Sequence, residues 1–317
     1  MSKLRCGVIG VGYLGRFHAQ KYAALSAVDF VGVYDLSSSQ AAQVAGELSV
    51  KAYLDVSELL HDVDAVSIAA STRAHFLIAK QCLEQGIHVL IEKPITPTLK
   101  EAQLLIELAK KKSLILQVGH LERFNQAYQV FDKYVSQPQW IEMQRLAPFK
   151  KRGSDVDVIL DLMIHDLDIL LSWVKTPIDT IQAQGFSMIT NAIDLASAVI
   201  KFTDGCVANL TASRVHSTVE RLTRVYQGPD YYVLNYQEQQ LSRYITDANS
   251  QDNLFLAHEP IPCIKQDSLM LQIQSFVDAV QGQSSVLVDG RAGYQALELA
   301  LKIQSLIDVK INEAQFV

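Results

Sequence analysis

The feature that most constrains this chain is a glycine-rich turn close to its start. Gly10, Gly12 and Gly15 form a GxGxxG pattern after an apolar run at 4–9 and before a stretch with helical spacing at 13–25. In a strand–turn–helix unit, the first glycine permits a tight turn, the second admits a pyrophosphate, and the third lets helix and strand pack closely. The helix start then offers N–H groups and a positive dipole end to phosphate. The pattern predicts a dinucleotide-binding turn; the alternative is a glycine turn that has lost its cofactor.

An acidic residue follows the second apolar run. Asp35 comes directly after a predicted strand at 30–34, at the distance from Gly15 where a carboxylate binds the ribose hydroxyls of a dinucleotide. The same carboxylate repels a 2′-phosphate, and the following Leu36-Ser37-Ser38 offers no arginine to compensate. We therefore expect the cofactor to be NAD rather than NADP.

The first third of the chain alternates short apolar runs with stretches of helical spacing. Further strands are expected at 65–70, 88–91 and 114–118, and further helices are expected at 38–47, 75–85 and 99–112. Repeated strand–helix units predict a parallel sheet that is covered by helices on both faces. We expect residues 1–120 to form a doubly wound Rossmann domain of the α/β class.

The pattern changes near residue 120. A strand is expected at 140–146, a long helix at 156–174, and successive strands with few helices at 178–244. Gly185, Asp204-Gly205 and Gly228-Pro229 are read as turns in this region. Two helices, expected at 268–281 and 291–307, close the chain. We expect residues 121–317 to form an α+β catalytic and oligomerisation domain with a large, mostly antiparallel open sheet.

Composition excludes several classes of protein. The net charge of −6 disfavours a nucleic-acid partner, which needs a basic surface. No segment reaches the roughly 18 uninterrupted apolar residues of a membrane span, and the apolar stretch near the N-terminus is too interrupted by glycine for a signal peptide. The four cysteines lie far apart, and no histidines or cysteines have metal-ligand spacing. We expect a cytoplasmic protein with reduced thiols and no metal site.

Three motifs occur in order along the chain. The glycine turn is followed by Glu92-Lys93-Pro94 after the predicted strand at 88–91, and later by the Asp-x-x-x-His pattern of Asp161 and His165. Together they resemble the glucose–fructose oxidoreductase, inositol dehydrogenase and rhizopine-catabolism family (Gfo/Idh/MocA), and the resemblance covers essentially the whole chain. That family often has glycines before the Asp-x-x-x-His helix, whereas this chain has Asp155-Val-Asp157-Val-Ile, so its substrate subgroup is not the generic one.

The resemblance implies an NAD-dependent oxidoreductase acting on a CH–OH group, and it extends the set of expected cofactor contacts beyond the glycine turn. Thr72 and His75, which lie just before and at the start of the predicted helix at 75–85, belong to the matching segments. The expected cofactor-binding residues are Gly10, Gly12, Tyr13, Leu14, Asp35, Thr72, His75, Glu92 and Lys93.

Two segments point to a branch of the family. The run from Gly119 to Asn125 and the form of the segment at 158–168 look like the nucleotide-sugar branch, in particular UDP-N-acetylglucosamine 3-dehydrogenases. Such enzymes make a 3-keto sugar, which a partner aminotransferase can aminate, for example toward an amide-linked lipid A. The resemblance therefore implies a small-molecule substrate, with UDP-N-acetylglucosamine as the best guess.

Oxidation of a secondary alcohol needs a hydride acceptor and a base for the hydroxyl proton. Lys93 follows a strand end, where parallel sheets place their sites, and a partly desolvated lysine can hydrogen-bond the reacting hydroxyl. Asp161 and His165 are four residues apart on a predicted helix and therefore share a face. We expect His165 to act as base or proton shuttle and Asp161 to assist it, although the sequence does not decide whether Lys93 or His165 takes the proton first. In the family, a cis peptide bond precedes the proline, a role that Pro94 fits.

Basic and polar residues supply candidates for substrate binding. His120 and Arg123 follow the last strand of the first domain, and Asp168 lies one turn beyond His165. Arg123 could bind a phosphate or carboxylate, or it could form an interdomain salt bridge. The segment at 145–152 holds Arg145, Lys150, Lys151 and Arg152, which could clamp a diphosphate or form a solvated basic loop. The expected substrate residues are Arg123, Arg152, His120 and Asp168.

Two other functions stay open. A dehydrogenase of a free sugar or inositol would not need the basic segment. A non-catalytic NAD-binding regulator on the same fold should have lost a catalytic residue, whereas Lys93, Asp161 and His165 are all present. The resemblance also implies a homodimer or homotetramer, because family members commonly pair their open sheet faces.

Overall fold

The chain forms two compact units, and each unit is built from two separate segments of the sequence. The computed structural model describes residues 3–150, 156–246 and 256–314. Unit 1 consists of Met1–Leu121 and Asp267–Tyr294, and unit 2 consists of Glu122–Gln266 and Gln295–Val317. The sequence predicts a boundary near residue 120. The expected continuous second domain, 121–317, is interrupted, because helix α8 (Ser268–Val280) packs on helix α1 (Tyr13–Ala24) in unit 1.

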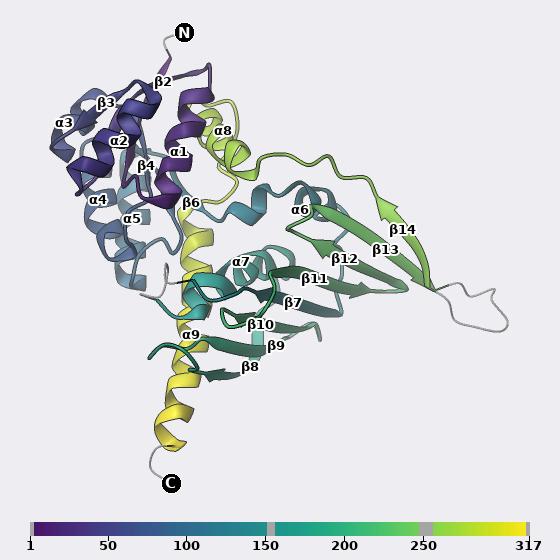
Figure 1. Ribbon diagram of the computed structural model, residues 1–317. Coiled ribbons are helices and arrows are strands. Elements are labelled where there is room, and N and C mark those ends of the chain that lie inside the picture. Colours follow the sequence, from purple (N-terminus) through teal and green to yellow (C-terminus); the bar gives the residue numbers. More distant parts are fainter. Residues whose placement is uncertain (1–2, 151–155, 247–255, 315–317) are drawn as a thin grey trace. The chain divides into compact units, whose positions relative to one another are not determined.

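Unit 1 is built on a six-stranded parallel sheet with the strand order β3-β2-β1-β4-β5-β6, which confirms the predicted Rossmann fold. Helices α1, α2 and α8 cover one face, and α3, α4 and α5 lie against the other (Figure 1). The strands are β1 (Leu4–Ile9), β2 (Val28–Tyr34), β3 (Lys51–Tyr53), β4 (Ala65–Ile68), β5 (His88–Glu92) and β6 (Leu116–Gly119). The remaining helices are α2 (Ser38–Leu48), α3 (Val56–Asp62), α4 (Thr72–Glu84) and α5 (Leu99–Lys112).

Local sequence explains most of these elements. Strands β4 and β5 are apolar runs buried almost throughout, as a sheet covered on both faces requires. Helix α5 begins after the N-cap residue Thr98, whose Oγ1 accepts from Glu101 N–H and donates to the Glu101 carboxylate. The short elements β3 and α3 were not predicted, because three and seven residues carry too little periodicity to be recognised.

Unit 2 contains an eight-stranded mixed sheet with the order β14-β13-β12-β11-β7-β10-β9-β8. Among the described strands of this sheet, only β7 and β10 pair in parallel, so the expected large, mostly antiparallel sheet is confirmed. Gly185 is not a turn as predicted but lies inside β8, where a Cβ atom would come 2.7 Å from the Ile307 side chain. The strands are β7 (Trp140–Leu146), β8 (Ile178–Phe186), β9 (Leu195–Phe202), β10 (Val207–Ser213), β11 (Glu220–Gln227), β12 (Asp230–Asn235), β13 (Gln240–Thr246) and β14 (Leu256–Ile261).

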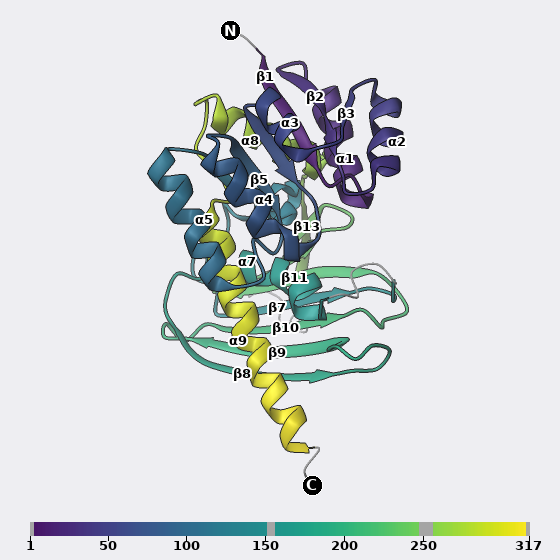
Figure 2. The ribbon, with the colours of Figure 1, turned by 90° about the vertical axis from the view of Figure 1, so that its left-hand side faces the viewer.

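The helices of unit 2 pack against one face of this sheet and close its hydrophobic core. Helix α9 (Gly290–Ala314) starts in unit 1 and continues across β7, β10, β9 and β8 (Figure 2). The other helical segments are the 3₁₀ turn η1 (Leu121–Phe124), α6 (Gln126–Phe131), the π-helix η2 (Ile159–Met163) and α7 (Ile164–Trp173).

The described residues also allow a search for membrane-spanning helices and for paired cysteines. Within the described ranges, no helix is long and apolar enough to cross a membrane. All four cysteines are free thiols, and Cys6, Cys82 and Cys206 are buried.

Candidate functional site

The glycine turn has the geometry that its pattern predicted. Gly10 has a φ of +82°, and a Cβ atom there would come 2.7 Å from the backbone nitrogen of Ala70. A Cβ atom on Gly15 would overlap the carbonyl oxygen of Gly10, so helix α1 can approach β1 only through a glycine. At Gly12, by contrast, a Cβ atom would meet nothing within 4 Å. The open space at Gly12 lies beside the N-terminus of α1, and it fits a pyrophosphate.

Asp35 is fixed at the end of β2 by the same turn. Its Oδ2 accepts a hydrogen bond from Val11 N–H at 2.7 Å, and its Oδ1 accepts one from Ser37 N–H at 2.9 Å. The Gln40 side chain in turn donates to the Val11 carbonyl oxygen at 3.1 Å. Each carboxylate oxygen keeps acceptor capacity, so the residue is oriented and still able to bind ribose hydroxyls.

The other predicted cofactor residues of unit 1 follow strand ends on the same edge of the sheet. Thr72 opens α4 after β4, while Glu92 ends β5 and Lys93 follows it. In doubly wound sheets the ligand binds at this carboxyl edge, where the strand order reverses between β1 and β4. The edge therefore carries the glycine turn, the acidic residue and the lysine together. His120, which follows β6, is only 1% exposed and offers little surface to a ligand.

A buried histidine holds the backbone beside Lys93. The peptide bond between Lys93 and Pro94 is cis, as the resemblance implied. The two ring nitrogens of His75 lie 2.9 Å from the Pro94 carbonyl oxygen and 3.1 Å from that of Ala70. Burial lowers the pKa of His75. His75, expected as a cofactor contact, is 1% exposed and thus supports the site through the backbone of two loops.

Glu92 contacts His18, a partner that the sequence did not predict. Its Oε1 lies 3.1 Å from Nε2 of His18, which is fully buried in α1, and its Oε2 accepts from Lys93 N–H at 3.4 Å. Burial raises the pKa of Glu92, but hydrogen bonding and charge from His18 outweigh it and hold the pKa below its usual value. A Cβ atom on Gly119 would come 2.5 Å from this carboxylate. The sequence did contain an indication of this role: His18 is a polar residue among the apolar, buried positions of α1, and such a residue needs a partner.

In unit 2, the residues expected to catalyse lie where a π-helix passes into an α-helix. The predicted helix at 156–174 is divided into η2, which carries Asp161, and α7, whose first turn carries His165. Asp157 caps the start, because its Oδ1 accepts from Ile159 N–H at 3.0 Å and Leu160 N–H at 2.9 Å. Asp161 and His165 are both partly exposed. π-turns often mark functional sites, because they change which side chains a helix presents.

Arg123 and Asp168, both expected to bind substrate, bind each other. Arg123 Nε lies 2.6 Å from Asp168 Oδ2, and Nη2 lies 3.2 Å from Oδ1. Nη1 donates to the hydroxyl of Tyr128 at 3.1 Å. Because both partners belong to unit 2, the alternative of an interdomain salt bridge is wrong. The Asp168 side chain is 2% exposed, so its carboxylate is committed to this pair.

The expected basic segment at 145–152 is only partly correct. Arg145 does not lie in a loop but in β7, where it is 2% exposed, because inward and outward side chains alternate along the strand. Its Nη2 lies 2.7 Å from Asp166, and its Nη1 lies 2.7 Å from Glu122. Burial lowers the pKa of Arg145, but the two carboxylates raise it overall; burial raises the pKa of Asp166 against the effect of Arg145. Lys150 is exposed, while Lys151 and Arg152 lie outside the described residues.

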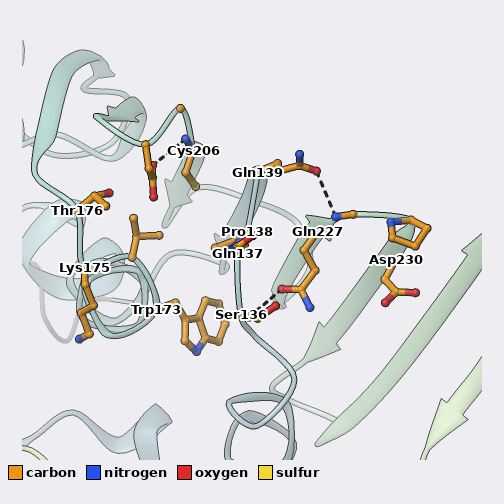
Figure 3. A pocket seen from close by; sticks show the side chains of 15 residues that line it. Ser136, Gln137, Pro138, Gln139, Trp173, Lys175, Thr176, Cys206, Gln227 and Asp230 are labelled. Atoms are coloured by element: carbon orange, nitrogen blue, oxygen red, sulfur yellow. Dashed lines mark hydrogen bonds between the residues drawn. The ribbon is translucent and has the colours of Figure 1, made fainter.

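The hollow in Figure 3 does not coincide with the predicted site residues. It has a volume of about 1030 Å³ and lies in unit 2 at the C-terminal end of α7, around Trp173, Lys175 and Thr176. Residues 136–139, the turn before Cys206, and Gln227 at the end of β11 with the turn that follows it complete the lining. Asp161 and His165 are at the opposite end of the helical segment. Across the described part of the chain, no group of histidine, cysteine, aspartate or glutamate residues is suited to hold a metal ion.

These features define a class of protein. A doubly wound sheet with an open glycine turn, a fixed carboxylate after β2 and a lysine after β5 is an NAD-binding oxidoreductase domain. The chain belongs to the Gfo/Idh/MocA family: residues 4–120 match the oxidoreductase family with an NAD-binding Rossmann fold, and residues 127–227 match the GFO/IDH/MocA C-terminal domain. It is thus an enzyme of a family of dehydrogenases that act on CH–OH groups.

The similarity to individual relatives extends over nearly the whole chain. UDP-N-acetylglucosamine 3-dehydrogenase of Acidithiobacillus ferrooxidans is 40% identical over 311 residues, 97% of this chain and 98% of the relative. Its solved structure superposes with a TM-score of 0.91 at 38% identity, covering 98% of this chain and 99% of the other. Myo-inositol 2-dehydrogenase of Thermotoga maritima is 25% identical and covers 97% of both chains.

Proposed function

We propose that this enzyme oxidises the 3-hydroxyl of UDP-N-acetylglucosamine to a ketone, with NAD as the acceptor. The observation that carries the proposal is the 40% identity, over 97% of the chain, to a dehydrogenase of that name. The catalytic candidates Lys93, Asp161 and His165 are all present, which argues against a non-catalytic regulator. The 3-keto product is a substrate for an aminotransferase, for example toward an amide-linked lipid A.

Asp35 supports NAD over NADP. Its carboxylate is held by two backbone N–H groups at the end of β2, where it would bind ribose hydroxyls and repel a 2′-phosphate. Leu36, which follows, is 92% exposed and supplies no positive charge. The ratio of kcat/KM for NAD to that for NADP tests this choice, and a ratio below one would overturn it.

The proposed mechanism gives separate roles to Lys93, His165 and Asp161. The bound nicotinamide supplies the hydride acceptor. Lys93 hydrogen-bonds the reacting hydroxyl and stabilises the negative charge that develops on its oxygen. His165 receives or relays the hydroxyl proton, and the Asp161 carboxylate stabilises the charged ring. The pH profiles of Lys93 and His165 variants distinguish which of the two takes the proton first.

The candidates for holding the sugar nucleotide are fewer than the sequence implied. Arg123 and Asp168 are used in their mutual ion pair, so we propose Arg152 as the remaining candidate for gripping the diphosphate. Exchanging Arg152 for alanine should weaken binding of the sugar nucleotide far more than binding of NAD. Equal effects on both ligands would remove this assignment.

A row of aromatic side chains supports assembly into a homodimer or homotetramer. Tyr226 stacks on Tyr231 at 4.6 Å between ring centroids, Tyr231 contacts Tyr244 at 5.1 Å, and Tyr244 stacks on His258 at 4.9 Å. Trp140, the cross-strand neighbour of Tyr226, is 41% exposed. Exposed aromatic rings in contact with one another are typical of protein interfaces. We propose that this sheet face pairs with a second copy of the chain.

The direct test mixes the purified protein with NAD and UDP-N-acetylglucosamine and follows NADH absorbance and product mass. Formation of NADH and a product lighter by two hydrogen atoms, both lost in Lys93→Ala, would support the proposal. Turnover of myo-inositol or a free sugar instead would favour the second candidate, which the Thermotoga maritima relative supports. Binding of NAD without turnover of any of these substrates would contradict both.

A further inference from the structure

Two adjacent residues of η1 are connected by buried ion pairs to Asp166 and Asp168 in the N-terminal half of α7. Arg123 pairs with Asp168, while Glu122 is connected to Asp166 through Arg145. The side chains of Arg145 and Asp166 are each 3% exposed, and that of Glu122 is 10% exposed. The three groups come from η1, β7 and α7, so the network joins three elements of unit 2.

The network is completed by polar and aromatic neighbours. Arg221, the cross-strand partner of Arg145, places Nη1 3.6 Å from Glu122. The guanidinium of Arg145 also lies 5.5 Å from the ring centre of the buried Tyr236. Two positive and two negative side chains therefore balance one another. Buried ion pairs contribute little net stability compared with apolar groups of the same size, so a gain in stability does not by itself account for this network.

The network also bears on the residues expected to catalyse. His165 lies between Ile164 and Asp166 in the first turn of α7, directly after the π-helix. A π-turn that converted to an α-turn would shift the following helix by one residue, which is a rotation of about 100°. The ion pairs of Asp166 and Asp168 oppose such a shift, because each carboxylate would lose its arginine. Other contacts hold the two ends of the segment. Arg214 donates to the Val156 carbonyl oxygen at 2.7 Å, and Trp173 Nε1 donates to Asp132 Oδ1 at 3.0 Å.

We propose that Arg145 is a positioning residue: through Asp166 and Glu122 it holds the rotational register of α7, and with it the side chain of His165. The Arg123–Asp168 ion pair is a second contact that fixes the same part of α7. This role rests on the proposed function, in which His165 handles the substrate proton. It also gives the run from Gly119 to Asn125 a purpose other than contact with substrate.

The test compares Arg145→Met, which keeps the length of the side chain, with Arg145→Lys, which keeps the charge but loses the forked geometry. Arg243→Met is the matched control, because it breaks another ion pair of unit 2, with Asp230 at 2.8 Å, far along the sheet. We expect Arg145→Met to lower kcat per folded molecule by roughly 10–100-fold, with KM for the sugar nucleotide and Kd for NAD changed little. The kcat of Arg145→Lys should lie between those of Arg145→Met and the wild type. Arg243→Met should keep the wild-type kcat.

A second readout does not depend on the substrate. The ring signals of His165 in a histidine-labelled NMR spectrum, assigned with His165→Asn, should shift in Arg145→Met and stay in place in Arg243→Met. A normal kcat per folded molecule with an unshifted His165 signal would overturn the positioning role, even if Arg145→Met melted at a lower temperature. A shifted signal in a protein that does not oxidise UDP-N-acetylglucosamine would support the positioning role and reject the proposed function. If Arg145→Met does not fold, Arg145→Lys and Asp168→Asn are subjected to the same two measurements.

Discussion

At the scale of single residues, the described site depends on side chains that never reach the surface. His18, His75 and Arg145 are buried, and each holds a neighbour of a residue that is expected to act on cofactor or substrate. Lys93 receives this support from two sides, through Glu92 and through the backbone of Pro94. The residue that performs the chemistry and the residue that places it are therefore separate.

Lys93 is expected both to catalyse and to contact the cofactor, and loss of its amine should affect the chemical step more than NAD binding. We expect Lys93→Met to lower kcat by about 10²–10⁴-fold, the usual contribution of a positioned proton-transfer group, while the Kd for NAD stays within about threefold. Steady-state kinetics and NAD titration measure the two quantities. A parallel loss of NAD binding would place Lys93 in cofactor recognition instead.

The contact between His18 and Glu92 should make stability depend on pH. The pKa of Glu92 is held below its usual value in the folded state, so its ionised form favours folding at neutral pH, and this contribution is lost as pH falls through the folded pKa. His18→Ala leaves a buried carboxylate without this partner and should lower the free energy of unfolding by about 1–3 kcal/mol at neutral pH. The difference from wild type should shrink in acid.

Urea denaturation of both proteins at neutral and acidic pH provides the measurement. His61→Ala is the control, because the His61 side chain is 90% exposed and its removal should change stability little. An equal difference between His18→Ala and wild type at both pH values would show that the histidine acts by packing alone.

At the scale of elements, two glycines of one turn have separable roles. Gly15 permits the approach of α1 to β1, whereas Gly12 faces open space. We expect Gly15→Ala to destabilise the fold by roughly 1–3 kcal/mol, the range for overpacking. Gly12→Ala should leave the melting temperature unchanged but weaken NAD binding at least about tenfold, because its methyl group would occupy the place of the pyrophosphate.

Gly46→Ala serves as the comparison for both variants. Gly46 lies in α2, and a methyl group there would meet nothing within 4 Å. The exchange should therefore leave NAD binding unchanged and raise stability slightly, since alanine favours the helix. Normal NAD binding by Gly12→Ala would mean that the pyrophosphate does not approach this residue.

At the scale of the whole molecule, the open sheet face determines which assembly is expected. Tyr231 and Tyr244 are central in the aromatic row on strands β12 and β13. A charge placed in a packed interface loses its hydration without gaining a partner. We expect Tyr244→Glu to shift the protein toward the monomer while each unit stays folded, as measured by light scattering and circular dichroism. An unchanged mass would exclude this face as the interface.

The sequence by itself determined whatever depends on neighbours along the chain. The glycine turn, the acidic residue after β2, the Glu-Lys-Pro tripeptide and the alternation of strands and helices are local patterns, and each predicted its element or its chemistry. The tertiary structure decided what depends on residues brought together from distant segments. Arg145 pairs with groups 21 and 23 residues away, and Glu92 contacts His18 across 74 residues. The tertiary structure also decided that α8 belongs to unit 1. The apolar face of an amphipathic helix can pack on either sheet, so its sequence does not show which sheet it covers.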